Sequence, residues 1–183
     1  AQGRDLFTYR DLVETSEGGN ISLGDNDNNG FLRYWGLAGD GTLYVAPDYD
    51  EYRLDVYDTA GRLARVIRRD YERQRRSEEE IREEEEELEA LNARFRSDDG
   101  GHIGREIRKW TRNIENIHPR PDGTLWVETG RGMFQRPAGV VGTFDVFDAE
   151  GRFVNQITLK AEFDPRRDDF VIAGDRLFVL KEA

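Results

Sequence analysis

The sequence predicts an all-β protein built from four-stranded antiparallel sheets and interrupted by one helical insertion. The main observation is an internal repeat. The run Asp-Gly-Thr-Leu-Tyr-Val at 40–45 returns at 122–127 as Asp-Gly-Thr-Leu-Trp-Val. A second matching pair follows these runs, at 54–63 and 144–153, and a shorter third copy lies at 174–179. The chain therefore contains two to three related units.

Each unit has the pattern of short strands joined by tight turns. An Asp-Gly pair ahead of Thr-Leu-aromatic-Val is typical of a turn that leads into a strand. In 54–57 and 144–147, successive side chains point to opposite faces of a sheet. The loops at 58–61 and 148–151 suit a type I turn closed by a glycine with positive φ. Further strand-like runs on either side complete four strands per unit.

Four repeated strands per unit predict a partial β-propeller, because the blades of this architecture are four-stranded sheets that stack on one another. The residues outside the insertion suffice for about two to three blades, whereas a closed ring needs about four to eight. We therefore expect residues 1–183 to form a single incomplete domain. Its exposed blade edges would offer a route to oligomerisation. A β-sandwich with two similar hairpins is the alternative.

The segment 71–112 lacks the β pattern and predicts an acidic helical insertion between the blades. Residues 77–80, Ser-Glu-Glu-Glu, form a capping box, so a helix should follow to about Phe95. A second, weaker helical stretch is expected at 103–110. Nine of the twelve residues after Ser77 are glutamates. Such a helix either lies solvated on the rim of the blades or acts as a lid or docking element.

Composition excludes several classes of function. The net charge is −11 and the isoelectric point is near 4.8, so we expect no nucleic-acid partner, because phosphates require a basic surface. No apolar run approaches the roughly 18 residues of a membrane helix. The absence of cysteine excludes disulfides, thiolate zinc sites and a cysteine nucleophile. No catalytic constellation stands out, which favours a binding protein over an enzyme.

Two loops at equivalent places in the repeat, 48–53 and 130–137, are candidates for contact with a protein, peptide or small ligand. Their aromatic and basic side chains are Tyr49, Tyr52, Arg53, Arg131 and Phe134.

A second candidate lies just before the second Asp-Gly pair. His118 and Arg120 there could bind an anion or a carboxylate. A turn braced by the two neighbouring prolines explains the same segment without a ligand.

A possible calcium site is the one metal site that the sequence indicates. Asp25, Asp27 and Asn29 occupy positions 1, 3 and 5 of a calcium loop, with Gly30 at the sharp turn. Position 12 is Gly36, where such a loop requires a bidentate glutamate. An Asn- and Asp-rich turn without an ion is the alternative, and no other cofactor is expected.

The unit Asp-Gly-Thr-Leu-aromatic-Val, followed by hydrophobic-Asp-Val-aromatic-Asp-x-x-Gly-Arg, resembles a blade of the bacterial six-bladed β-propellers related to NHL-repeat and TolB-like proteins. The resemblance covers 31–71 and 113–183. It implies a ring of blades in a periplasmic or extracellular protein that binds proteins, peptides or other ligands. We therefore expect a non-enzymatic binding module. One alternative is a fragment of a propeller hydrolase or lyase whose site is completed by missing blades. Another is a structural piece that assembles through its blade edges and acidic helix.

Overall fold

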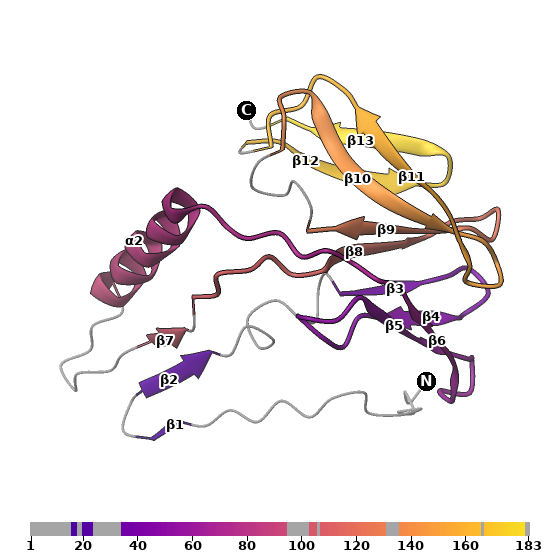
Figure 1. Cartoon of the computed structure of the whole chain (residues 1–183), viewed down its shortest axis with the longest axis horizontal. Helices are drawn as coiled ribbons and strands as arrows, with labels where there is room; N and C mark the ends of the chain where they lie inside the picture. The colour runs from indigo at the N-terminus through magenta and orange to yellow at the C-terminus, as the bar shows by residue number, and fades with distance from the viewer. Residues whose placement is uncertain are drawn as a thin grey trace, which may run out of the picture. The chain divides into compact units, whose positions relative to one another are not determined.

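The structure is a computed structural model, and it describes residues 34–94, 107–130, 136–165 and 167–181 together with the backbone of three short strands outside them (Figure 1). The chain divides into two compact units, which we describe separately. The sheet unit comprises Arg33–Gln74 and Thr111–Ala183, and the helix unit comprises Ala1–Leu32 and Arg75–Trp110.

The sheet unit contains two antiparallel four-stranded sheets, each in chain order, and one hairpin. The first sheet comprises β3 (Trp35–Leu37), β4 (Leu43–Val45), β5 (Arg53–Tyr57) and β6 (Leu63–Arg68). The second sheet comprises β8 (Ile114–Pro119), β9 (Leu125–Thr129), β10 (Val140–Phe147) and β11 (Phe153–Lys160). The hairpin comprises β12 (Asp169–Ala173) and β13 (Arg176–Leu180). The predicted all-β class and the four-stranded antiparallel sheets are confirmed.

The turns that close the outer hairpins of the two sheets have the same hydrogen bonds. Asp58 Oδ1 accepts from the amides of Ala60 at 2.9 Å and Arg62 at 3.0 Å. In the second sheet, Asp148 Oδ1 accepts from the amides of Glu150 at 3.0 Å and Arg152 at 2.8 Å. A glycine with φ of 75° or 80° completes each turn. This local chemistry explains why the repeated Asp-x-x-Gly-Arg sequence closes a hairpin in both copies.

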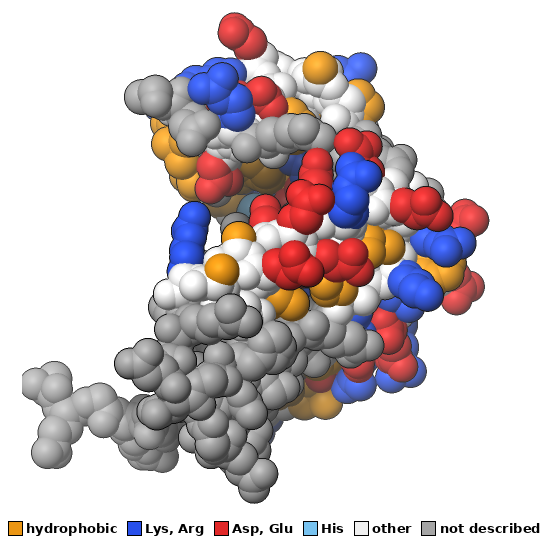
Figure 2. Space-filling view, turned by 90° about the vertical axis from the view of Figure 1, so that its left-hand side faces the viewer, with side chains coloured by type: hydrophobic (Ala, Val, Ile, Leu, Met, Phe, Trp, Pro, Cys, Tyr) orange, Lys and Arg blue, Asp and Glu red, His pale blue; other side chains and the backbone are white. Residues whose placement is uncertain are grey.

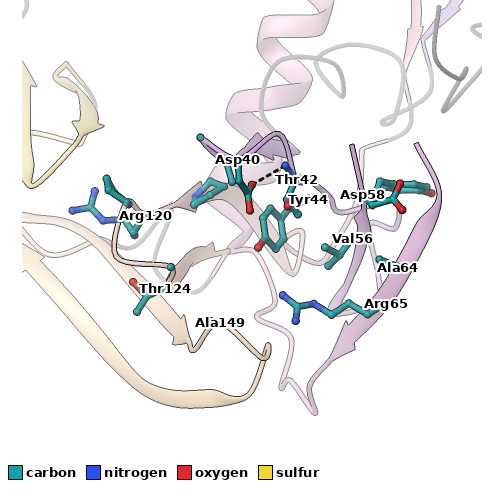
Figure 3. A pocket seen from close by; sticks show the side chains of 16 residues that line it. Asp40, Thr42, Tyr44, Val56, Asp58, Ala64, Arg65, Arg120, Thr124 and Ala149 are labelled. Atoms are coloured by element: carbon teal, nitrogen blue, oxygen red, sulfur yellow. Dashed lines mark hydrogen bonds between the residues drawn. The ribbon is translucent and has the colours of Figure 1, made fainter. Parts of the chain in front are cut away.

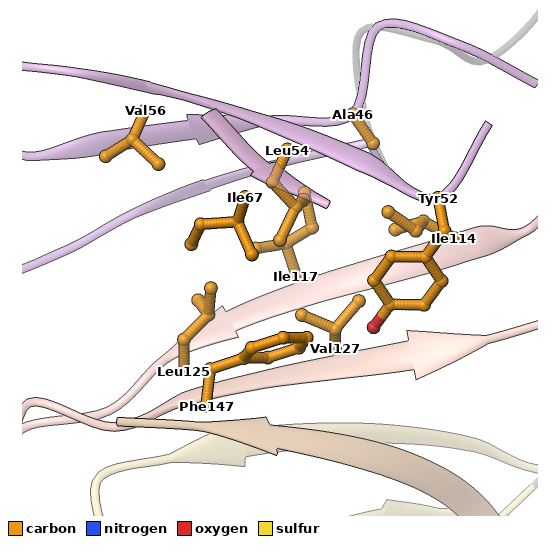
Figure 4. Packing of buried hydrophobic residues seen from close by; sticks show 10 residues of the cluster. All are labelled: Ala46, Tyr52, Leu54, Val56, Ile67, Ile114, Ile117, Leu125, Val127 and Phe147. Carbon is orange, nitrogen blue, oxygen red and sulfur yellow. The ribbon is translucent and has the colours of Figure 1, made fainter. Parts of the chain in front are cut away.

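The main core lies between the first and second sheets (Figure 4). Leu54 and Ile67 of the first sheet pack toward Leu125 and Phe147 of the second. The strands β3 and β8 approach each other closely at Gly36, where an added Cβ would lie 2.6 Å from the Ile117 carbonyl oxygen. The two sheets are therefore stacked face to face, with the first strand of one beside the first strand of the other.

The hairpin packs on the opposite face of the second sheet. The Phe170 ring centroid lies 6.2 Å from that of Phe144 and 6.2 Å from that of His118. Phe163, before the hairpin, adds an edge contact to Phe170 at 6.1 Å. The shorter third copy of the repeat thus continues the stack that the two full copies begin.

The helix unit contains the predicted acidic helix, α2 (Glu78–Arg94). The capping box forms as expected, because the Glu80 amide donates to Ser77 Oγ at 3.2 Å and Glu80 Oε2 accepts from the Ser77 amide at 2.5 Å. Arg76 anchors the start of this helix by an ion pair with Glu84 and a hydrogen bond to the Arg108 carbonyl. Among the described residues, no helix is long and apolar enough to cross a membrane.

The second helix predicted at 103–110 is wrong. Its first residues form β7 (Ile103–Arg105), which pairs in parallel with β2 (Asn20–Leu23), itself paired with β1 (Ser16–Glu17). A helix this short has little stability of its own, so pairing with a strand distant in sequence overrides the local pattern.

Candidate anion-binding pocket

A cavity of about 610 Å³ lies between the turn ends of the first and second sheets, inside the sheet unit (Figure 3). The β3–β4 turn and strands β5 and β6 supply one side of its lining. The β8–β9 turn supplies the other side, with Ala149 of the β10–β11 turn. The apolar part of the lining includes Val56, Ala64 and Pro119, and the polar part includes two arginines, Arg65 and Arg120.

Arg120 lies at the edge of the pocket, in the turn that the repeated Asp-Gly pair forms, and its side chain points away from Arg65 (Figure 3). Its amide donates to the Thr124 carbonyl at 2.8 Å, and its carbonyl accepts from the Gly123 amide at 3.1 Å. Gly123 has φ of 84°, a conformation that glycine adopts without strain. The guanidinium lies 4.6 Å from the ring centroid of Trp126, so the indole face stabilises its charge.

Arg65 reaches the pocket from β6 because of the strand register. It pairs with Val56 across the first sheet, and Val56 belongs to the buried face that packs on the second sheet. The guanidinium carbon lies 3.8 Å from where a Cβ on Gly151 would stand, beside the β10–β11 turn. Arg65 Nε is buried and has no hydrogen-bond acceptor among the described residues. Such a nitrogen is a donor available to a bound ligand.

The acidic residues of the pocket are occupied by their own turns. Asp40 Oδ1 accepts from the Thr42 amide at 2.9 Å, and this hydrogen bond lowers the pKa of Asp40. Asp58 accepts from the Arg62 amide and from Arg62 Nε, which lowers the pKa of Asp58 in the same way. Within the described part of the chain, neither pocket arginine has an ion-pair partner. Both carboxylates are satisfied, whereas the Arg65 guanidinium keeps a donor for a ligand.

This arrangement suits an anion whose oxygens can accept two parallel hydrogen bonds from a guanidinium group. A guanidinium group presents its donors in a fixed fork that matches a carboxylate or a phosphate. Tyr44 lines the same cavity and supplies aromatic surface for the rest of a ligand. The pocket can therefore bind a small acid or the acidic end of a larger molecule.

His118, predicted with Arg120 as an anion ligand, has a different position. Its ring lies between Phe144, at 5.7 Å, and Phe170, at 6.2 Å, under the β12–β13 hairpin. Burial, with a smaller effect of the Arg120 charge, lowers the pKa of His118 to about 4. The imidazole is therefore neutral near pH 7 and contributes no positive charge beside the pocket.

The residues of the loop 48–53 that are predicted to contact a ligand instead make contacts within the protein. Tyr52 is a core residue, only 4% exposed, with its ring 6.2 Å from Phe147. Arg53 binds Asp55 through two hydrogen bonds of 2.8 and 3.1 Å. The Tyr49 carbonyl accepts from the Asn113 amide at 3.2 Å, and the Tyr49 ring lies 5.5 Å from the Arg112 guanidinium. None of the three lines the pocket.

The remaining predicted residues, Arg131, Phe134, Asp25, Asp27 and Asn29, lie outside the described residues, so their roles stay predictions. In the described part of the chain, no group of three or more His, Asp or Glu side chains is placed to hold a metal ion.

Sequence reasoning identified Arg120 but missed Arg65. The signal was present in the strand alternation, since Arg65 lies two residues before Ile67 and so shares its face. The signal for Arg65 is therefore a basic residue on the face of a strand that packs on the neighbouring sheet, two positions from a buried apolar residue.

Charged side chains elsewhere are interleaved. On the face drawn in Figure 2, acidic and basic side chains lie beside one another over the surface. The ion pairs Arg62–Asp58, at 2.8 Å, and Lys181–Asp168, at 2.7 Å, are examples of this pairing. Arg65 differs from these surface arginines, because it has no ion-pair partner in the described part of the chain. No family model and no curated protein matches this chain.

Proposed function

We propose that this chain is a non-enzymatic, propeller-like binding module whose pocket recognises a carboxylate group on its ligand. The observation that carries the proposal is Arg65, whose buried Nε has no acceptor among the described residues, in a cavity whose own carboxylates are already hydrogen-bonded. A buried donor without an acceptor is costly, so a bound anion would offset that cost.

Support for propeller-like blades comes from the order of the strands. Both sheets run from first to fourth strand in chain order, and the first strands, β3 and β8, lie side by side. The hairpin of the third copy stacks on the next face in the same direction. These features match successive blades that radiate from a common inner edge.

The size and charge of the site favour a carboxylate ligand with an apolar portion. A cavity of about 610 Å³ falls within the usual range of small-molecule sites. The net charge of −11 repels anions in general, so binding must depend on the local charge of Arg65. A small organic acid and an acidic peptide end present the same group, and titration distinguishes them.

The test is a titration of isotopically labelled protein followed through the arginine Nε–H signals. The probes are succinate, a short peptide capped at its N-terminus and ending in glutamate, and inorganic phosphate. We expect a carboxylate probe to shift the Arg65 signal, and the tighter of the two carboxylate probes identifies the source. The variant Arg65→Gln should weaken binding by about 10-fold, which corresponds to the loss of one charge-assisted hydrogen-bond donor.

Arg152→Gln is the matched control, because it removes the same charge from an exposed arginine at the β10–β11 turn. Its binding should equal that of the wild type. Stronger binding of phosphate than of either carboxylate probe would contradict the ligand class. Equal binding by Arg65→Gln and Arg152→Gln would contradict the site.

A further inference from the structure

Two apolar faces lie at the ends of the stack in the sheet unit. The leucine face belongs to the first sheet and comprises Leu37, Leu43 and Leu63. The hairpin face belongs to β12–β13 and comprises Val171, Phe178 and Leu180. Leu37 is 59% exposed and Leu63 is 51% exposed, while Phe178 is 48% exposed and Leu180 is 53% exposed. Within the sheet unit, no described strand lies against either face.

The repeat shows that the leucine face and the hairpin face have opposite roles in the stack, since one packs on the preceding layer and the other receives the following layer. Leu43, Leu125 and Leu177 occupy one position in the three copies. Leu125 is 2% exposed and packs on the first sheet. Leu177 pairs with Ile172 and shares the side of Phe170, which contacts the second sheet. In both cases this leucine position packs on the preceding layer of the stack.

The neighbouring aromatic position behaves in the opposite way. Tyr44, Trp126 and Phe178 are equivalent in the three copies. Tyr44 packs on the core that the first sheet shares with the second. The Trp126 ring lies 6.0 Å from Phe144, on the side of the second sheet that receives the hairpin. The aromatic position therefore receives the following layer, and on the hairpin it is Phe178 that is exposed.

From this direction of packing we infer that the chain associates head to tail with a second copy of itself. The hairpin face of one copy packs against the leucine face of the next. The interface continues the two contacts already made inside the sheet unit, in which a leucine face covers an aromatic face. The chain itself presents the surface that its hairpin face requires, which identifies a second copy as the occupant.

The expected interface is heterologous, since the two contributing surfaces differ. Such an interface builds a ring when the rotation closes and an open chain when it does not. Each copy carries a net charge of −11, so repulsion opposes assembly. Added salt screens that repulsion and should strengthen the association, because the contact itself is apolar.

The test uses light scattering with size-exclusion chromatography on the full chain, from micromolar to millimolar concentration. The wild type should associate as concentration rises. Phe178→Asp and Leu37→Asp each remove one face and should each remain monomeric. Val154→Asp is the control, because Val154 is 59% exposed on β11 and belongs to neither face.

Mixing the two variants gives the decisive result. Phe178→Asp keeps an intact leucine face, and Leu37→Asp keeps an intact hairpin face. An equimolar mixture should therefore form a dimer that grows no further. Circular dichroism and thermal melting check that each variant is folded, and Leu180→Asp replaces Phe178→Asp if the latter unfolds.

Three outcomes would overturn the inference. The wild type could remain monomeric at every concentration and salt level. Leu37→Asp could associate as the wild type does, which would mean that the hairpin face pairs with itself. The mixture of monomeric variants could also fail to form a dimer.

Discussion

Asp145 of the second sheet forms an ion pair with Arg69, which follows the last strand of the first sheet, and the Asp145 side chain is completely buried. Gln156 donates to the other carboxylate oxygen at 2.8 Å. The Tyr52 hydroxyl lies beside the pair, and burial together with the Asp145 charge raises the pKa of Tyr52. A buried ion pair therefore joins the two sheets beside their shared apolar core.

We expect Asp145→Asn to lower the free energy of unfolding by about 3 kcal/mol, because it leaves the Arg69 charge without its buried partner. Urea denaturation measures the change. The double variant Arg69→Gln with Asp145→Asn should be more stable than Asp145→Asn alone, since no uncompensated charge remains. A double variant that is less stable than Asp145→Asn would contradict this account.

The buried imidazole of His118 predicts a pH dependence of stability. Its pKa falls from about 6.5 in the unfolded chain to about 4 in the fold, so the unfolded state takes up the proton first. The contribution of His118 is complete above pH 6.5 and is lost as the pH falls toward 4. Linkage gives a loss of about 3 kcal/mol.

The measurement compares urea denaturation of the wild type and of His118→Phe between pH 4 and pH 7. Other groups titrate in both proteins, so the difference between the two curves isolates the histidine. The wild type should lose more stability than the variant as the pH falls. Parallel curves would show that His118 does not titrate in this way.

Gly36 provides a test of how closely β3 and β8 approach. A Cβ at this position would lie 2.6 Å from the Ile117 carbonyl oxygen and 2.7 Å from Pro119 Cδ. Gly36→Ala should therefore cost about 2 kcal/mol or more, because the inner strands must separate. Gly39→Ala is the matched control, since nothing lies within 4 Å of its Cβ. Thermal unfolding of both variants measures the difference, and equal melting temperatures would contradict the close approach.

The capping box predicts a local effect at α2. Ser77→Ala removes the side-chain oxygen that accepts from the Glu80 amide. We expect a cost of about 1 kcal/mol in helix stability, seen as lower helicity by circular dichroism. Ser77→Asp should retain most of the helicity, because its carboxylate also accepts from the first turn and suits the helix dipole. Equal loss in both variants would show that the cap has no role.

The local parts of the fold could be predicted from the sequence because their causes are local. The Asp58 and Asp148 side chains close their turns by accepting from amides four residues later in the chain. The repeated sequence therefore reveals both turns. The capping box likewise lies within four residues. β7 could not be predicted, because its pairing with β2 joins segments about eighty residues apart.

The same distinction applies to the site. Arg120 could be recognised, since it adjoins a turn that sequence marks clearly. The burial of His118 could not, because the ring that covers it, Phe170, belongs to a hairpin some fifty residues later. Tyr52 and Tyr49 belong to one short loop, yet only the former enters the core. Which side of a strand becomes buried depends on the neighbouring sheet.

The near-identity of the two turn sequences has a consequence for how this protein can diversify. Residues that maintain the hairpins are duplicated in both copies, whereas the pocket arginines are not. Arg65 corresponds to Asn155, and Arg120 corresponds to Ala38. The duplicated scaffold is thus chemically separate from the positions that face the cavity. Mutation of those positions can change the chemistry that the cavity accepts while the hydrogen bonds that build the hairpins stay intact.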